Sequence, residues 1–165
     1  GSGAYPTNGP PITGSSCANK LHVMGFSAER GIGEVLENFG HRVEGTMVHI
    51  YGVWNSYTPT TDWEKFAATD HYIPGKAACG GVHYAPNSER DYDWSNSQYA
   101  NSTCDDWLNY PNLTGATKLI NCSTWSCNEY DGYTYKKWWF MHLPHAAGQT
   151  DGKWNNWWRY VVNSD

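Results

Sequence analysis

The stretch that decides the fold is residues 28–52, which read AERGIGEVLENFGHRVEGTMVHIYG. Large apolar side chains recur here every three or four residues, and at about 100° per residue they fall in one narrow stripe. The stripe consists of Ile32, Leu36, Phe39, Val43, Met47, Ile50 and Trp54. This spacing predicts one long amphipathic helix over residues 28–52 with Ser27 as its N-cap, or two helices broken near Gly40 or Gly45.

The side of this helix opposite the stripe carries acidic and histidine side chains without a lysine. They are Glu34, Glu37, His41 and Glu44, flanked by Gly33 and Gly45. An interior glycine costs about 0.5–1 kcal/mol relative to alanine, so glycines here indicate that another segment packs closely over this face. A covered face of this kind would perform acid–base chemistry or bind a metal, with Glu37, His41 and Glu44 as catalytic residues. The alternative is an ordinary solvent-exposed face.

Two groups elsewhere in the chain are candidates to complete such a site. His142 and His145 are three residues apart and stiffened by a proline, so we expect them to converge with His41 on a metal ion. Asp91 and Asp93 are predicted to supply the second catalytic carboxylate of a glycosidase, or oxygen ligands for Ca²⁺. The identity of any cofactor stays open, with Zn²⁺ and Ca²⁺ as the candidates.

Aromatic side chains must form much of the core. The chain holds 10 Trp, 12 Tyr and 4 Phe but only 19 Ile, Leu and Val together. Residues 133–141 and 154–162 alternate in part and suggest two strands linked through the turn formers at 148–152. Rings left outside the core can stack on sugars. We therefore predict a ligand-binding group that consists of His83, Trp154, Trp158 and Tyr160.

Five cysteines indicate an oxidising compartment. Cys122 and Cys127 could close a short loop, which would leave Cys79 and Cys104 to pair, although the sequence does not fix this connectivity. Cys17 is then the odd one, either a buried free thiol or a link to an upstream segment or another chain. A disulfide from Cys17 to a second copy of the chain would make the chain self-associate.

Three N-glycosylation sequons begin at Asn101, Asn112 and Asn121. Together with the cysteines they predict a secreted glycoprotein. The net charge of −5, from 11 Lys and Arg against 16 Asp and Glu, does not suit a nucleic-acid partner. No apolar run approaches the roughly 20 residues that cross a bilayer, so no membrane span is expected.

These observations predict a loop-rich, disulfide-stabilised α+β domain over residues 17–165, with the long helix packed on a small irregular antiparallel sheet. An extended arm is expected over residues 1–16. The predicted function is a secreted hydrolase that acts on a glycan or cell-wall polymer through the carboxylate–histidine face. A non-catalytic carbohydrate-binding module and a self-assembling extracellular structural subunit are the alternatives, so the sequence does not decide whether the chain is an enzyme.

Overall fold

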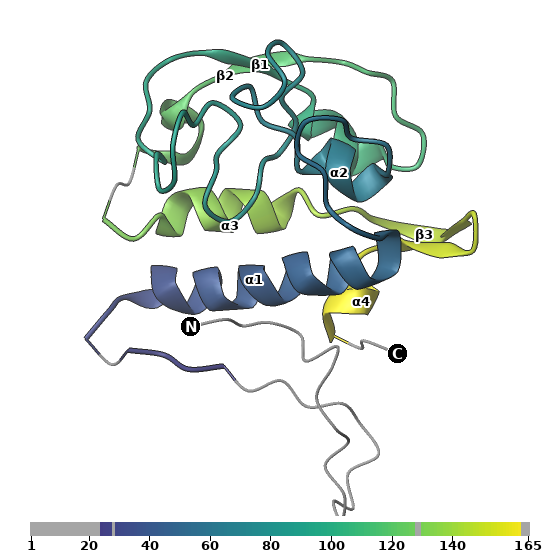
Figure 1. The fold of residues 1–165 in the computed structure, drawn as a ribbon, viewed down its shortest axis with the longest axis horizontal. Helices are drawn as coiled ribbons and strands as arrows, with labels where there is room; N and C mark the ends of the chain where they lie inside the picture. Colours follow the sequence, from purple (N-terminus) through teal and green to yellow (C-terminus); the bar gives the residue numbers. More distant parts are fainter. Residues whose placement is uncertain (1–23, 28, 128–129, 163–165) are drawn as a thin grey trace, which may run out of the picture.

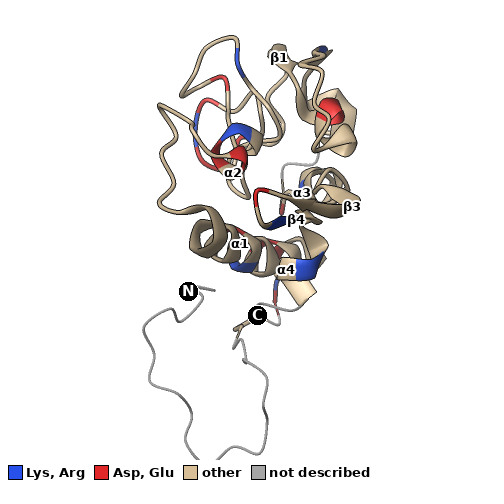
Figure 2. Cartoon of the chain, turned by 90° about the vertical axis from the view of Figure 1, so that its right-hand side faces the viewer, with Lys and Arg blue, Asp and Glu red and all other residues tan. Residues whose placement is uncertain are grey.

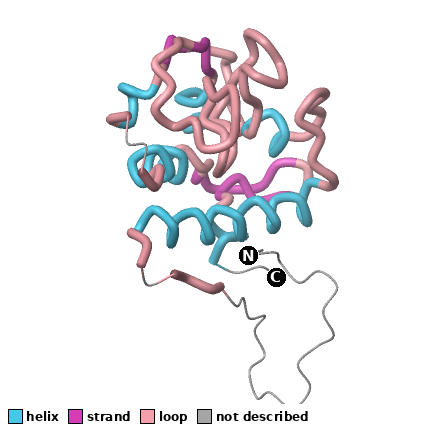
Figure 3. Tube along the Cα trace, turned by 60° about the vertical axis from the view of Figure 1, so that its left-hand side comes forward, coloured by secondary structure: helices cyan, strands magenta, loops and turns pink. Residues whose placement is uncertain are grey.

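The chain forms a loop-rich α+β structure, seen in a computed structural model that describes residues 24–27, 29–127 and 130–162. The two longest helices lie toward one side of the molecule, and long connections with short helical turns fill most of the other side (Figure 1, Figure 3). The predicted arm over residues 1–16 and Cys17 lie outside the described residues. The structural-subunit alternative, which depends on Cys17, is therefore not addressed by the fold.

The predicted long helix is α1, Ile32–Tyr51, and it is continuous through Gly40 and Gly45. It begins at Ile32 instead of residue 28, and Gly31 rather than Ser27 is its N-cap. The free N–H of Gly33 donates to a carboxylate oxygen of Asp131 at 3.1 Å. Asp131, almost 100 positions away in the sequence, thus accepts the hydrogen bond from the first turn of the helix that the N-cap Ser27 was expected to accept.

The buried face of α1 is rotated from the predicted apolar stripe toward the acidic side. Val43 and Met47 are fully buried, but Ile32 is 60% exposed. Gly33 and Gly40 are also buried. A Cβ at Gly33 would collide with Asp131, and a Cβ at Gly40 would collide with Val82. The buried face of α1 is therefore formed both by its glycines, which let other segments pack closely, and by its buried aliphatic side chains.

Helices, not a sheet, are the main partners of α1. The short helix α3, Tyr133–Met141, runs alongside it, and α2, Asp62–Phe66, and α4, Trp158–Val162, contact its C-terminal half (Figure 1). The first segment predicted as a C-terminal strand, residues 133–141, is thus helical, and the second forms a strand only up to Asn156 before α4 begins. Their aromatic residues are buried from several directions, which removes the one-sided pattern by which a surface helix is identified.

Instead of one sheet there are two separate antiparallel pairs. The first joins β1, Ala100–Ser102, to β2, Lys118–Ile120, and the second joins β3, His145–Thr150, to β4, Lys153–Asn156. Asp151 and Gly152 both have positive φ, as a two-residue hairpin turn requires. The 3₁₀ helices Cys104–Asn109 and Cys122–Trp125 punctuate the remaining loops.

Both expected disulfides are present, Cys79–Cys104 and Cys122–Cys127. They fasten the loops around a core that is mainly aromatic, as the composition predicts. Its centre is a set of rings in mutual contact: Trp63, Phe66, Trp107, Trp139 and Trp157. Each is at most 2% exposed. Large rings supply the apolar area that so few aliphatic residues cannot.

Charge and hydropathy agree with the sequence analysis. Lys and Arg are scattered over several elements rather than gathered in one stripe (Figure 2). Within the described part of the chain, none of the helices combines the length and the hydropathy needed to cross a bilayer.

Helix α2 shows how a buried carboxylate is stabilised in this fold. Thr61 and Glu64 form a reciprocal capping box, and Glu64 also accepts the backbone N–H groups of Asn55 and Thr60. Burial works to raise the pKa of Glu64, but these hydrogen bonds outweigh it and lower the pKa to about 2.

We expect Glu64→Gln to lower the free energy of unfolding at neutral pH by about 3 kcal/mol. This is the stability that the ionised carboxylate contributes when folding lowers its pKa from 4.5 to about 2. A depressed folded-state pKa contributes stability above the unfolded-state value, and this contribution is lost as the pH falls from about 5 toward 2. Urea unfolding at pH 7 and pH 3 measures the difference in the free energy of unfolding between the wild type and the Glu64→Gln variant. It should shrink at pH 3, and a difference that is the same at both pH values would contradict this account.

Candidate functional site

The predicted acidic face of α1 is covered. His41 Nδ1 contacts Glu44 Oε2 at 2.9 Å, one turn along the helix. The other oxygen of Glu44 accepts the backbone N–H of Val82 at 2.8 Å. Glu37, His41 and Glu44 are each only partly exposed, with 18%, 30% and 15% of the side chain accessible. The interpretation as an ordinary exposed face is therefore wrong, and the glycine argument is confirmed at Gly33.

The covering segment is the loop of residues 79–84, which lies between α1 and α3. Gly80 has φ +74°, and a Cβ there would collide with the carbonyl oxygen of Tyr84. The Tyr135 hydroxyl lies within 2.8–3.1 Å of three carbonyl oxygens of the loop, and Trp139 Nε1 donates to a fourth at 3.0 Å. The disulfide at Cys79 anchors the beginning of this loop. The Cys79-Gly80-Gly81 sequence therefore produces a tight turn that is held from both sides.

This loop places His83 against the helix. Its Nε2 lies 3.0 Å from His41 Nε2 and 3.3 Å from Glu37 Oε1. Facing a carboxylate, His41 Nδ1 carries a proton, so a neutral His41 presents an unprotonated Nε2 to His83. Glu37, His41 and His83 each offer one atom that can bind a metal, and these atoms lie within 4.8 Å of one another. Among the described residues, this is the group that could hold a metal ion. We call Glu37, His41 and His83 the central cluster.

Lys136 of α3 holds the second oxygen of Glu37. The Nζ atom lies 2.7 Å from Glu37 Oε2, 3.1 Å from the carbonyl of Gly33 and 2.6 Å from that of Asp131. All three of its protons thus have an acceptor, and its charge lies 4.2 Å from the centre of the Trp94 ring. Lys136 is 1% exposed. It positions Glu37 and leaves only Oε1 directed at the histidines.

The electrostatics follow from these contacts. Burial would raise the pKa of Glu37, but hydrogen bonds and positive charge from His83 and Lys136 lower it to about 2. The hydrogen bond to Glu44 raises the pKa of His41 in spite of burial. Burial lowers the pKa of Lys136, against the pairing with Glu37. Glu37 is therefore ionised over the whole physiological range.

Asp91 and Tyr92 flank His83 on its outer side. Asp91 Oδ1 lies 3.6 Å from His83 Nδ1, and the Tyr92 ring centre lies 4.4 Å from that of the imidazole. Tyr92 has φ +62°, a left-handed conformation that is unfavourable for an aromatic residue. Its N–H donates to the carbonyl of His83 at 2.9 Å, which fixes this conformation over the imidazole.

A pocket of about 310 Å³ opens beside the central cluster. Glu37 and Tyr92 form the wall nearest to the histidines. The complete lining is Arg30, Gly31, Glu34, Glu37, Tyr92, Trp94, Tyr130 and Asp131. Tyr92 and Tyr130 are 50% and 84% exposed, so their rings are available to a ligand. The pocket therefore joins exposed aromatic rings to carboxylates at the entrance to the cluster.

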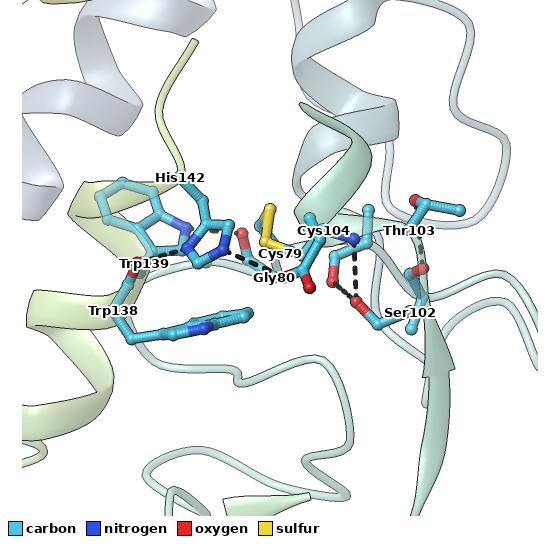
Figure 4. Close-up of a disulfide and its surroundings, with 12 residues drawn as sticks. Cys79, Gly80, Ser102, Thr103, Cys104, Trp138, Trp139 and His142 are labelled. Atoms are coloured by element: carbon cyan, nitrogen blue, oxygen red, sulfur yellow. Dashed lines mark hydrogen bonds and ion pairs between the residues drawn. A yellow bond between two sulfur atoms is a disulfide. The ribbon is translucent and has the colours of Figure 1, made fainter. Parts of the chain in front are cut away.

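The predicted grouping of His41 with His142 and His145 is wrong. His142 Nδ1 contacts the carbonyl of Trp138 at 2.7 Å, and its Nε2 contacts Asp105 at 3.2 Å. Figure 4 shows His142 beside Trp138, near the Cys79–Cys104 disulfide. His145 is exposed at the start of β3. Pro144 separates the two imidazoles into different environments rather than directing them at one point.

The other predicted site residues have different places. Asp91 is at the site, but Asp93 accepts hydrogen bonds from Glu89 N and Asn96 Nδ2 and stabilises a turn. The predicted common side of the C-terminal rings does not form either, because the chain turns into α4 at Trp158. Tyr160 is buried, and Trp154 lies under the Arg159 guanidinium at 3.7 Å.

Sequence reasoning placed His83 among the ligand-binding residues of the cleft but gave His142 and His145 as the metal partners of His41, and it missed Lys136, Tyr92 and Tyr130. The double glycine before His83 was the available signal for close approach to a helix. Lys136 gave none, since a lysine between aromatic residues is ordinarily exposed. Comparisons of the chain with protein-family models, curated proteins and solved structures give no match, so the functional argument depends on the site itself.

Replacing Lys136 should expose the dependence of the site on its buried ion pair. We expect Lys136→Met to lower the free energy of unfolding by about 3–5 kcal/mol, because it leaves the Glu37 carboxylate without its buried partner. Lys137→Met, one residue along on the exposed side of α3, is the matched control and should change stability by about 0.5 kcal/mol or less. Urea unfolding at pH 7 compares them, and equal effects would refute a special role for Lys136.

Proposed function

We propose that the chain is a secreted hydrolase that acts on a glycan or cell-wall polymer, with the central cluster as its reacting groups. The observation that carries this proposal is the continuity between the central cluster and the pocket, since Glu37 belongs to both and Tyr92, which lines the pocket, packs on His83. A polymer segment on the exposed rings of Tyr92 and Tyr130 would have its scissile bond next to Glu37 and the imidazoles.

The chemistry needs a proton donor and a proton acceptor at one bond. Imidazoles exchange protons near neutral pH, and both histidines of the cluster are about 30% accessible. In hydrolysis, water forms a bond to the electrophilic carbon and loses a proton to one group, while the leaving oxygen receives a proton from another. The ionised Glu37 suits stabilisation of the positive charge that develops on a sugar ring.

The predicted carboxylate pair is revised to fit the geometry. Glu37 and Asp91 lie next to opposite nitrogens of His83, so they are the predicted carboxylates that we assign to the reaction. Glu44 is committed to His41 and Val82, which makes it a positioning residue. Asp93 belongs to a turn and takes no part.

Two features support an extracellular location. The two disulfides suit an oxidising compartment. Two of the three sequon asparagines, Asn101 and Asn112, are exposed and accessible to glycosylation. Asn121 is 8% exposed, and its side chain binds Ser97 and Ser123, so we do not propose a glycan there.

The test is release of reducing ends from peptidoglycan, chitin, β-glucan and xylan by the full chain. We expect turnover of at least one polymer and a loss of about 10²–10⁴-fold in His83→Ala, because an acid–base group contributes that much. His145→Ala, an exposed histidine outside the site, is the control and should retain full activity. Circular dichroism and the melting temperature establish that the variants are folded.

The same panel distinguishes the binding-module alternative, which the exposed Tyr92 and Tyr130 favour. Tryptophan fluorescence that responds to a polymer without any release of reducing ends would replace the hydrolase with a carbohydrate-binding module. In that case Tyr130→Ala should weaken binding. A folded chain that neither binds nor cleaves any of the polymers would remove both proposals.

A further inference from the structure

We infer that Glu37 Oε1, His41 Nε2 and His83 Nε2 form a three-ligand zinc site with an open fourth position. This assignment goes beyond the proposed reaction, since a zinc ion would occupy the cluster whether or not the chain cleaves a polymer.

The spacing of the three atoms suits one small ion. Tetrahedral zinc with bonds of about 2.0–2.1 Å separates neighbouring ligand atoms by about 3.3 Å. The two histidine nitrogens are 3.0 Å apart, and His83 Nε2 is 3.3 Å from Glu37 Oε1. The third pair also lies within 4.8 Å. Without a metal, the two imidazole nitrogens can approach this closely only by sharing a proton.

The far nitrogen of each imidazole faces a carboxylate. His41 Nδ1 lies 2.9 Å from Glu44, and His83 Nδ1 lies 3.6 Å from Asp91. A carboxylate in this position favours the tautomer that directs the unprotonated Nε2 at the metal, and it increases the basicity of that ligand. Lys136 has the corresponding role for Glu37, because it occupies Oε2 and leaves Oε1 as a single donor. His41 and Glu37 are therefore oriented by a hydrogen-bonded second residue, whereas Asp91 is too far from His83 Nδ1 for a hydrogen bond and contributes only its charge beside that ligand.

The local charge also favours a dication. Three carboxylates, Glu37, Glu44 and Asp91, surround two histidines, and Lys136 offsets one of them. With neutral imidazoles the group carries two negative charges, which one divalent ion balances. Partial burial of Glu37, Glu44 and the two imidazoles makes such an imbalance more costly than it would be in water.

The ligand types select zinc over calcium. Ca²⁺ takes six to eight oxygen ligands, whereas two imidazoles and one carboxylate form a set that zinc enzymes use with water in the remaining position. The imidazoles are about 30% accessible, and Glu37 borders the pocket, so the fourth position can be reached by water and by a ligand. Zinc bound to the three ligands would lower the pKa of a water in the fourth position toward neutrality and supply a nucleophile, and the two imidazoles would then hold the ion instead of exchanging protons with the polymer.

The test is titration of the chelator-treated full chain with ZnCl₂ by isothermal calorimetry, under conditions that keep the disulfides oxidised. We expect one zinc ion per chain, and a loss of at least about 100-fold in affinity in His41→Ala and in His83→Ala. Glu44→Gln should weaken binding by about 10–100-fold, because it alters only the partner of a ligand. His145→Ala is the control and should bind as the wild type does.

A second readout does not depend on affinity. CoCl₂ added to the chelator-treated chain should give the visible absorption of four-coordinate cobalt, and His83→Ala should lose it while circular dichroism stays unchanged. A folded wild-type chain that binds no zinc would overturn the inference, as would unchanged affinity in both histidine variants. Zinc binding without polymer cleavage would remove the proposed function and leave the metal site. Cleavage by a chain that binds no zinc would do the reverse.

Discussion

The Glu44 carboxylate is the constraint on which the site depends. One oxygen accepts the backbone N–H of Val82 and so fixes the loop of residues 79–84 on α1. The other oxygen contacts His41 Nδ1 and so sets which nitrogen of that ring faces the loop. A single side chain therefore determines both where His83 comes to lie and which lone pair of His41 it meets. Without the contact to Val82, His83 would lose its position on the helix, and without the contact to His41, that imidazole would lose its orientation.

The remaining architecture supports this contact from behind. Gly40 allows Val82 to approach the helix, and Tyr135 and Trp139 of α3 hold the carbonyl groups of the same loop. The buried Lys136 joins α3 to Glu37 of α1. Three segments that are distant in the sequence, α1, the loop and α3, thus meet at the central cluster. The Cys79–Cys104 disulfide and the rings of Tyr135 and Trp139 hold the loop from several sides, which is what a preorganised site requires.

The sequence allowed prediction of the elements that depend on local pattern. The apolar spacing from Leu36 to Met47 located α1, and the glycine at position 33 indicated correctly that its acidic side is covered. The pattern failed where burial comes from several directions. Residues 133–141 and 158–162 carry aromatic rings on more than one side, so their helices have little amphipathic signal. Ile32 was placed in the core because the stripe ignores the close packing that glycines permit.

The site itself was half predictable for the same reason. Glu37, His41 and Glu44 share a helix face, and helical geometry alone brings them together. Their partner had to come from tertiary structure, and the sequence favoured the His142–His145 pair over His83, which lies on an irregular loop. The His142–His145 pair does not reach His41, because His142 binds Asp105 and the carbonyl of Trp138 instead. Lys136 could not be anticipated, since its three acceptors come from α1 and from the residues before α3.

The most direct measurement of the central claim is a crystal structure of the zinc-soaked chain with anomalous data collected at the zinc absorption edge. This account predicts one strong anomalous peak about 2.0–2.1 Å from His41 Nε2, His83 Nε2 and Glu37 Oε1, beneath the loop of residues 79–84. A structure in which that loop lies away from α1, with His41 facing solvent and no peak between the two imidazoles, would contradict it.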